Sequence, residues 1–319
     1  MKHLFIINPA AGKRDQSEEF RAKFDAFCRE NGLDYAVEVS AYKGNCTEIA
    51  RRAAESGEDC RIYACGGDGT LNEVIRGVVG AKNVAVTSFP GGSGNYFIRI
   101  FSDPSAFSDL KRLCSGPEAE LDLIKVGDLT YGVNICSVGV DARIAADAPK
   151  LKRLPGVTGS GAYNLSMVMH LFKGLTQPLE IELNSRLIRG DQTLLAICSG
   201  RFYGGGYQPV PEAEPDDGLL DVLLVKGVGI LKAATVIGAY KQGKYSEMPE
   251  LMTHSRTDSV TVRSEKPFCM NVDGEILSAT SVTFSVAPEK LRFFYPEGLT
   301  YHAKDLCKKS KNQEEICAS

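Results

Sequence analysis

The chain of 319 residues has no tryptophan, only four histidines, and no Cys-x-x-Cys pair among its ten cysteines. The histidines never stand beside the cysteines at the spacing of a zinc site, so nothing predicts a zinc centre and we expect reduced, mostly structural thiols. Neither sign of charge dominates, with 37 Lys and Arg against 40 Asp and Glu. This balance argues against a global electrostatic interaction with nucleic acid, although it leaves a local basic patch open.

Long apolar runs are also missing. No segment approaches the roughly 18 consecutive apolar residues of a membrane span, and Met1-Lys2-His3 leads into an apolar run without a secretory cleavage pattern. We therefore expect a cytoplasmic protein. With 43% hydrophobic and 24% charged residues, the chain has an ordinary globular composition and the length of about two domains.

The first 120 residues alternate short apolar runs with segments of helical apolar spacing. Strands are predicted at residues 4–7, 35–39, 61–65 and 83–88, and helices around residues 20–28, 49–54 and 71–79. This alternation is typical of a parallel sheet covered by helices. It predicts an α/β domain.

Beyond about residue 122 the pattern changes to short alternating runs separated by Gly, Pro and Asp. Such runs lie at residues 131–136, 194–198, 220–225, 259–262, 268–272 and 282–286. They predict a second domain built as an antiparallel sandwich, interrupted by helices near residues 163–175 and 230–240. The apolar run 291–295 cannot be assigned to either domain from its periodicity alone.

The strongest chemical signal is Gly66-Gly67-Asp68-Gly69-Thr70, between a predicted buried strand and an amphipathic helix. Glycines let a phosphate approach backbone N–H groups, and the helix start adds donors and partial positive charge. Asp68 would repel a bare phosphate, so the segment favours a magnesium nucleotide. The alternative, which does not exclude the first, is a tight turn followed by a capping box of Thr70 and Glu73.

Two further loops follow predicted strands, at the edge where open α/β sheets bind ligands. One is Pro90-Gly91-Gly92-Ser93-Gly94-Asn95, and the other is Asn8-Pro9-Ala10-Ala11-Gly12-Lys13. Neither the Gly66–Thr70 turn nor the Pro90–Asn95 loop matches the P-loop or the dinucleotide fingerprint. Lys13 offers a cation to a phosphate, the alternative being a solvated side chain.

These segments, together with Asn72-Glu73, Phe97 and Arg99, resemble the nucleotide-binding domain of the diacylglycerol kinase catalytic family, which includes soluble bacterial diacylglycerol kinases and sphingosine kinases. The similarity continues through Tyr203-Gly204-Gly205-Gly206, Pro211-x-Ala213, Asp216-Asp217-Gly218-Leu219-Leu220-Asp221 and Val272-Asp273-Gly274-Glu275. It covers nearly the whole chain in the family's order.

The resemblance implies a fold of class α/β with an NAD-kinase-like nucleotide-binding domain, here residues 1–122 and 290–319. A β-sandwich domain for the lipid substrate would be formed by residues 123–289, with the active site in the cleft between the domains. The run 291–295 would then be a strand that returns to the first domain. The implied reaction is magnesium-dependent transfer of the ATP γ-phosphate to a lipid hydroxyl, with diacylglycerol as the first choice of acceptor.

The resemblance also implies roles for single residues. Phosphoryl transfer needs positioning, charge neutralisation and a carboxylate at the acceptor hydroxyl, for which Asp68 is the metal-linked acid, Glu275 the base and Asp273 a support. A structural magnesium would bind Glu214, Asp217 and the Leu219 carbonyl, the alternative being an acidic solvated loop. For Asp273-Gly274-Glu275 the alternative is a plain hairpin turn. The implied nucleotide-binding residues are Asn8, Lys13, Ser40, Gly66, Gly67, Gly69, Thr70, Glu73, Gly91, Gly92, Ser93, Gly94 and Asn95.

Two positions depart from the family's pattern. Tyr96 stands where the family commonly has an aspartate, which removes a carboxylate near the metal and leaves metal affinity or substrate choice open to change. Ser40 takes the place of a nucleotide-contacting threonine.

A kinase for a membrane lipid must reach the bilayer, and we expect peripheral binding to the inner face of the membrane through basic segments. The candidates are residues 150–154 and the tail lysines Lys304, Lys308, Lys309 and Lys311. No nucleic-acid partner is expected, and the oligomeric state stays open, a homodimer included. Three other functions stay open: a kinase for another lipid alcohol such as a sphingoid base or phosphatidylglycerol, a soluble NAD-kinase-like small-molecule kinase, and a catalytically degenerate nucleotide-binding regulator.

Overall fold

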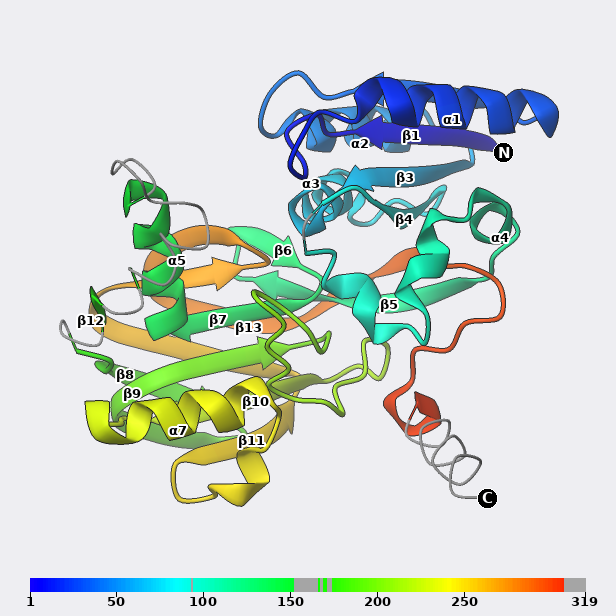
Figure 1. The fold of residues 1–319 in the computed structure, drawn as a ribbon. Coiled ribbons are helices and arrows are strands. Elements are labelled where there is room, and N and C mark those ends of the chain that lie inside the picture. Colours follow the sequence, from blue (N-terminus) through cyan, green and yellow to red (C-terminus); the bar gives the residue numbers. More distant parts are fainter. Residues whose placement is uncertain (93, 152–165, 167–168, 171–173, 307–319) are drawn as a thin grey trace, which may run out of the picture. The chain divides into compact units, whose positions relative to one another are not determined.

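The computed structural model describes residues 1–319 except 93, 152–165, 167–168, 171–173 and 307–319 (Figure 1). The chain divides into two compact units. Unit 1 consists of residues 1–123 and 287–319, and unit 2 of residues 124–286. Within the described residues, no helix has both the length and the apolar character needed to cross a membrane.

Unit 1 contains a parallel sheet. Its elements are β1 (Lys2–Ile7), α1 (Ser17–Glu30), β2 (Tyr35–Val39), α2 (Asn45–Glu55), β3 (Cys60–Gly66), α3 (Asp68–Val78) and β4 (Val84–Pro90). The strands lie in the order β2-β1-β3-β4, and the last residues of β13 (Glu275–Phe294) continue the sheet, with Phe293 paired in parallel to Val86. The α/β prediction is therefore confirmed, and the run 291–295 lies at the end of β13.

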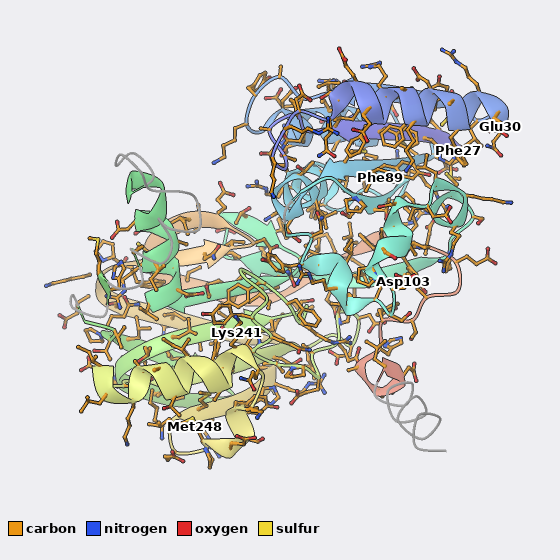
Figure 2. All side chains as sticks on the ribbon, viewed as in Figure 1. Phe27, Glu30, Phe89, Asp103, Lys241 and Met248 are labelled. Carbon is orange, nitrogen blue, oxygen red and sulfur yellow. The ribbon has the colours of Figure 1, made fainter. Side chains whose placement is uncertain are left out.

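The core of unit 1 explains why these segments fold as they do. β1 and β3 are almost completely buried, as strands covered on both faces must be. Helix α1 presents Phe20 and Phe24 to the sheet: the Phe24 ring stacks on Phe5 with centroids 4.2 Å apart and meets Phe89 edge-on at 5.0 Å. Figure 2 labels Phe89 at the end of β4 and the half-buried Phe27 on α1.

Short elements follow β4 and complete unit 1. They are η1 (Phe97–Ile100), η2 (Pro104–Ser108), α4 (Leu110–Cys114) and the first residues of β5 (Glu118–Val126). Phe97 and Phe101 pack against Phe293 of β13. This aromatic contact anchors the polypeptide that leaves the second glycine loop.

Unit 2 is an antiparallel sandwich, which confirms the second part of the predicted fold class. Its elements are β6 (Thr130–Gly132), β7 (Ile135–Gly139), α5 (Val140–Leu151), β8 (Gln177–Leu183), β9 (Arg186–Cys198), β10 (Leu220–Lys226), α7 (Ile230–Lys241), η3 (Tyr245–Glu247), β11 (Met252–Thr257), β12 (Ser259–Val272) and the first part of β13. One layer has the order β11-β10-β9-β7-β12-β13. β8 pairs with the other halves of β9 and β12, so these two long strands take part in both layers. Aliphatic side chains from both layers fill the space between them.

Several predicted strands differ from those observed. The run 131–136 is divided between β6 and β7, and the two runs 259–262 and 268–272 form one strand, β12, with an irregularity between Arg263 and Phe268. β8 and the largely polar β11 were not predicted. The predicted helix 230–240 is α7, whereas the helix expected near 163–175 falls mostly outside the described residues.

Candidate active site

The carboxyl ends of β1, β3 and β4 meet at one edge of the parallel sheet of unit 1. The chain passes from β1 to β2 on one side and later from β3 to β4 on the other, so the strand order reverses between β1 and β3. Open α/β sheets bind ligands at such a point. Three loops lie here, at residues 8–16, 66–70 and 90–95, and we call them the edge loops.

The two glycine turns form one hydrogen-bonded unit. The backbone N–H groups of Gly91 and Gly92 donate to the carbonyl oxygen of Gly66 over 2.8 and 3.0 Å. A Cβ atom on Gly92 would lie 2.4 Å from the Cα atom of Gly67, and one on Gly66 would lie 2.2 Å from the Thr70 hydroxyl oxygen. Gly92 has to be glycine because the two backbones pack closer than a side chain permits, and Gly66 because the Thr70 side chain fills the space beside it.

The first edge loop is tied to both turns. The Asn8 amide donates to the Thr70 hydroxyl at 3.0 Å, and the Gln16 amide donates to the Gly91 carbonyl at 2.9 Å. Gly12 has φ +81°, and a Cβ atom there would lie 2.5 Å from the Gly91 oxygen. Gln16 was not predicted as a site residue, because a single glutamine before a helix belongs to no motif.

Helix α3 begins without a side-chain cap. Its N-cap residue is Gly67, and Thr70 is buried inside the first turn with its N–H bonded to the Gly67 carbonyl. The capping-box interpretation is therefore wrong. The Glu73 carboxylate instead accepts the N–H of Gly44 at 3.1 Å, and this hydrogen bond holds the start of α2 against α3. A helix N-terminus capped by glycine suits an anionic ligand.

The space above the first turn of α3 is open. Gly69 is exposed, and a Cβ atom there would have no protein atom of another segment within 4 Å. Beside it, one oxygen of the half-buried Asp68 carboxylate accepts the Phe97 N–H at 3.0 Å, which fixes its orientation. Backbone donors next to an oriented carboxylate fit a nucleotide phosphate accompanied by a hard cation.

The 90–95 loop continues into an aromatic contact where the family commonly has an acid. The Tyr96 ring packs on Gly94, while the Arg99 guanidinium lies 4.5 Å from the centroid of that ring and donates to the Gly94 carbonyl at 3.1 Å. Asn95 has φ +47° and donates to the Gly92 carbonyl at 2.9 Å. Its buried amide oxygen has no partner within the described part of the chain, so it offers a ligand an acceptor. Ser93 lies outside the described residues.

The two remaining nucleotide-binding candidates of unit 1 differ in burial. Lys13 is exposed on the first edge loop. Ser40 is buried directly after β2, and its N–H donates to the Ile7 carbonyl at 2.8 Å, which places it at the same sheet edge. Beside it, burial raises the pKa of the Cys46 thiol to about 11, partly opposed by a hydrogen bond with the Ser40 side chain. This thiol is therefore un-ionised at neutral pH.

The hairpin between β12 and β13 carries the predicted base. Asp273 and Gly274 both have positive φ, 47° and 95°, as in a two-residue hairpin turn of type I′. The Asp273 carboxylate accepts the N–H groups of Val133 at 2.6 Å and Ile135 at 2.9 Å, and that of Asn134 between them. Asp273 thus anchors the segment that separates β6 from β7. Half-buried Glu275 follows as the first residue of β13.

The two carboxylates predicted to hold a structural magnesium pair with different arginines. The Glu214 carboxylate pairs at 3.0 Å with Arg201, which is only 2% exposed and also donates to the Ala213 carbonyl at 2.8 Å. Asp217 pairs with a different arginine, Arg256, and accepts the Leu219 N–H at 3.1 Å.

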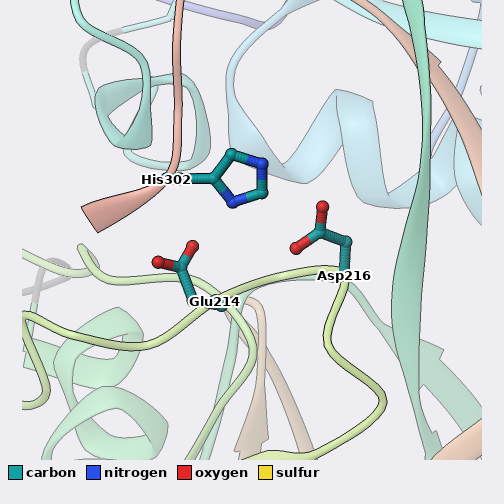
Figure 3. A group of neighbouring side chains, drawn as sticks. All are labelled: Glu214, Asp216 and His302. Atoms are coloured by element: carbon teal, nitrogen blue, oxygen red, sulfur yellow. The ribbon is translucent and has the colours of Figure 1, made fainter. Parts of the chain in front are cut away.

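Two guanidinium groups therefore already balance the charges of these carboxylates. Figure 3 shows Glu214 with Asp216 on the same loop, their carboxylate oxygens within 4.8 Å. Because each carboxylate already pairs with a cation, the arrangement does not itself favour a magnesium ion, and the site at Glu214, Asp217 and the Leu219 carbonyl stays a prediction.

Unit 2 contains a small apolar pocket, with a cavity volume of about 60 Å³, between α5, α7 and the sheet. Most of its lining is aliphatic, including Ile144, Leu194, Val236 and Ile237. Neither composition nor motif spacing predicted this pocket, because its lining comes from segments far apart in sequence.

A polar cluster lies at this pocket. Asp141 accepts hydrogen bonds from Ser137 at 2.7 Å and from the Tyr203 hydroxyl at 3.1 Å, and the Tyr203 and Tyr240 hydroxyl oxygens are 2.8 Å apart. Burial raises the pKa of Asp141, with the hydrogen bonds from Ser137 and Tyr203 opposing the shift. The pocket therefore suits a largely hydrocarbon ligand with a polar end.

Comparison with known families gives two matches along the chain. The diacylglycerol kinase catalytic domain matches residues 2–126, and the YegS C-terminal NAD kinase beta sandwich-like domain matches residues 134–295. A relative from Chromohalobacter salexigens named "Probable lipid kinase YegS-like" is 31% identical over 296 residues, 90% of this chain and 92% of the relative. A relative of the same name from Pseudomonas fluorescens is 28% identical and covers 93% of this chain and 96% of its own length.

Solved structures show the same fold. A diacylglycerol kinase from Bacillus anthracis superposes with a TM-score of 0.68 at 20% identity, over 93% of this chain and 97% of that one. An NAD kinase from Archaeoglobus fulgidus, solved with ATP, superposes with a TM-score of 0.52 at 12% identity, over 93% and 94% of the two chains. At these identities the likeness concerns the fold alone.

Proposed function

Because this chain belongs to the family of lipid kinases that join a diacylglycerol kinase catalytic domain to a YegS-type C-terminal domain, we propose that it phosphorylates diacylglycerol with ATP, giving phosphatidic acid. The observation that carries the choice of a lipid acceptor is the apolar pocket of unit 2 with Asp141, Tyr203 and Tyr240 at it. A lining of this kind favours hydrocarbon over a sugar or a nucleotide.

The edge loops support ATP as the donor. Backbone N–H groups at the uncapped start of α3 bind the phosphates, and exposed Gly69 leaves them room. Asp68 holds the magnesium that accompanies ATP, which supplies positive charge against the phosphate oxygens. Lys13 adds a second positive charge from the first edge loop, and the unpartnered Asn95 oxygen accepts a hydrogen bond from the nucleotide.

Glu275 acts as the base in this proposal. Its carboxylate accepts the proton of the lipid hydroxyl while that oxygen forms a bond to the γ-phosphorus, and the bond from the γ-phosphorus to the β,γ-bridging oxygen breaks to release ADP. Asp273 positions rather than reacts, because its carboxylate oxygens are engaged by the backbone N–H groups of residues 133–135. The Asp273 anchor holds the hairpin from which Glu275 projects.

The test of this function is a screen with labelled ATP. The acceptors are diacylglycerol, a sphingoid base, phosphatidylglycerol and monoacylglycerol in vesicles, with NAD and fructose 6-phosphate in solution. We expect labelled phosphatidic acid. A labelled product from another lipid alone would replace diacylglycerol as the acceptor, and a product from a soluble acceptor alone would reject the lipid substrate. ATP binding without any product would favour a regulator.

The role of Glu275 has a matched control in the same unit. Glu275→Gln removes the base and should lower kcat by about 10²–10⁴-fold with an unchanged Kd for ATP. Exposed Glu265 of β12 undergoes the same chemical change in Glu265→Gln, for which we expect wild-type rates. Equal rates for both variants would remove Glu275 from the mechanism.

We also propose that the enzyme meets its substrate by peripheral binding to a membrane. Lys304 is exposed in unit 1. The other basic candidates, residues 150–154 and Lys308, Lys309 and Lys311, lie outside the part of the chain whose side chains the structure describes.

A further inference from the structure

The N-terminal end of α7 exposes two consecutive aliphatic side chains. Ile230 is 56% exposed and Leu231 is 99% exposed, and exposed Lys232 follows them. The other exposed large hydrophobic side chains in the described part of the chain stand singly in the sequence, at Met1, Tyr42, Leu129 and Leu187. Single exposed apolar residues are ordinary, whereas adjacent ones at the end of a helix indicate a partner. We call residues 230–232 the α7 tip.

Other residues of the same helix line the apolar pocket. Ala233, Val236 and Tyr240 are each at most 4% exposed and belong to the pocket lining, as does Ile237. The α7 tip is therefore continuous, within one turn of helix, with the place where the proposed function puts the acyl chain. A surface that lies beside a lipid pocket has an evident reason to contact lipid.

The charges of α7 have one sign. Its sequence Ile-Leu-Lys-Ala-Ala-Thr-Val-Ile-Gly-Ala-Tyr-Lys contains Lys232 and Lys241 and no acidic residue. Between these lysines the exposed residues Ala234 and Thr235 are small and uncharged. Aliphatic residues beside cations fit the interface of an anionic bilayer, where the side chains enter the acyl region and lysine stays among the phosphates.

We propose that the α7 tip inserts into the surface of an anionic phospholipid bilayer and so brings the pocket of unit 2 to its substrate. This inference rests on the proposed function for the purpose of the contact, but the contact itself requires no catalysis. A protein partner fits less well, because a stable protein interface buries about 800 Å² on each side, while the tip offers two aliphatic side chains. A bilayer needs only a small reversible anchor.

The absence of tryptophan makes a direct test possible, since Leu231→Trp introduces the only indole of the chain. The variant is mixed with vesicles of phosphatidylglycerol and phosphatidylcholine, without diacylglycerol and without ATP. We expect a blue shift of its emission and quenching by brominated lipids. Leu129→Trp, at a residue 56% exposed in the turn between β5 and β6, is the control and should show neither. Unchanged emission of Leu231→Trp would overturn the proposal.

A second pair of variants links the tip to turnover. Leu231→Asp should lower partitioning into these vesicles by about tenfold or more, because one leucine side chain no longer enters the bilayer. It should also lower the rate at which long-chain diacylglycerol in vesicles is phosphorylated. Phosphorylation of a short-chain diacylglycerol below its micelle concentration should stay at the wild-type rate, because Leu231 does not line the pocket. Leu129→Asp should leave all three measurements unchanged.

The outcomes separate this inference from the proposed function. If Leu231→Trp inserts into vesicles but the protein phosphorylates no diacylglycerol, diacylglycerol is rejected as the acceptor and insertion of the α7 tip is retained. If Leu231→Asp loses short-chain and vesicle activity equally, insertion of the α7 tip is rejected and diacylglycerol is retained as the acceptor. Circular dichroism of both aspartate variants should match the wild type, since neither leucine is buried.

Discussion

The backbone N–H of Gly92 donates to the carbonyl oxygen of Gly66 at 3.0 Å, so the turn after β4 is bonded to the turn after β3. Two loops that are separate in the sequence therefore behave as one rigid element at the carboxyl edge of the sheet. Their contact has no tolerance for a side chain, since a Cβ atom on Gly92 would come within 2.4 Å of the Gly67 Cα atom. The position of each turn is therefore fixed by the other.

The substitution Gly92→Ala should separate these turns. We expect a loss of about 1–3 kcal/mol in the free energy of unfolding from overpacking, together with loss of ATP binding measured by calorimetry. Gly238→Ala is the control, because a Cβ atom on that glycine of α7 meets nothing within 4 Å. Wild-type ATP affinity in Gly92→Ala would show that the joined turns are not the phosphate site.

The substitution Gly69→Ala tests the same site without disturbing its packing. Open space surrounds that position, so the melting temperature should stay within a few degrees of the wild type. The added methyl group occupies the place proposed for phosphate, and the Kd for ATP should rise about tenfold or more, equivalent to about 1.4 kcal/mol. An unchanged Kd would move the phosphates away from the start of α3.

Asp273→Asn tests the anchor beneath the proposed base. The amide replaces one acceptor oxygen with a donor that faces backbone N–H groups, so the free energy of unfolding should fall by about 2 kcal/mol. Because Asp273 belongs to unit 2, the Kd for ATP should not change. Exposed Asp128 supplies the control Asp128→Asn, which should be neutral in denaturant unfolding. Equal stability of the two variants would contradict the anchoring role.

Asp141 should make stability depend on pH. Burial raises its pKa in the folded protein above the ordinary value of 3.8. Its contribution to stability is therefore fully present below pH 3.8, where the group is neutral in both states, and is lost as the pH rises through the folded pKa. Asp141→Asn, which stays neutral, should exceed wild-type stability at pH 7 by an amount on the order of 1 kcal/mol.

The advantage of Asp141→Asn should disappear toward pH 4 in a series of denaturant titrations. A wild type more stable than Asp141→Asn at pH 7 would show that the hydrogen bonds from Ser137 and Tyr203 outweigh the cost of burying the charge.

The loop that carries Asp217 should be independent of divalent ions. Its carboxylate pairs with Arg256, so a metal chelator should leave the melting temperature of the nucleotide-free protein unchanged. Arg256→Gln should lower the free energy of unfolding by about 1 kcal/mol, because Asp217 and the nearby buried Asp221 lose a cation. Arg189→Gln removes a more exposed pair with Glu180 and serves as the control, for which we expect a smaller effect. Destabilisation by the chelator alone would indicate a metal bound at this loop.

Much of the architecture was predictable because its signals are local. The four parallel strands of unit 1 were predicted within one or two residues at most ends, since each is a short apolar run between a turn and an amphipathic helix. The strands of unit 2 were predicted less well. β11 is a polar strand at the edge of a layer, and the break between β6 and β7 is held by the carboxylate of Asp273, which lies far along the chain.

The amino-acid sequence was enough for the class of fold, the two glycine turns and the kinase family, because these depend on periodicity and on short motifs whose residues are chain neighbours. Three-dimensional contacts decided the details of the sites. Gln16 donates to Gly91, two arginines pair with Glu214 and Asp217, and Asp141, Tyr203 and Tyr240 meet at one pocket. These partners are separated by tens of residues or more in most cases, and only packing brings them within hydrogen-bonding distance. A motif records which chemical groups are present, whereas the fold determines which of them meet.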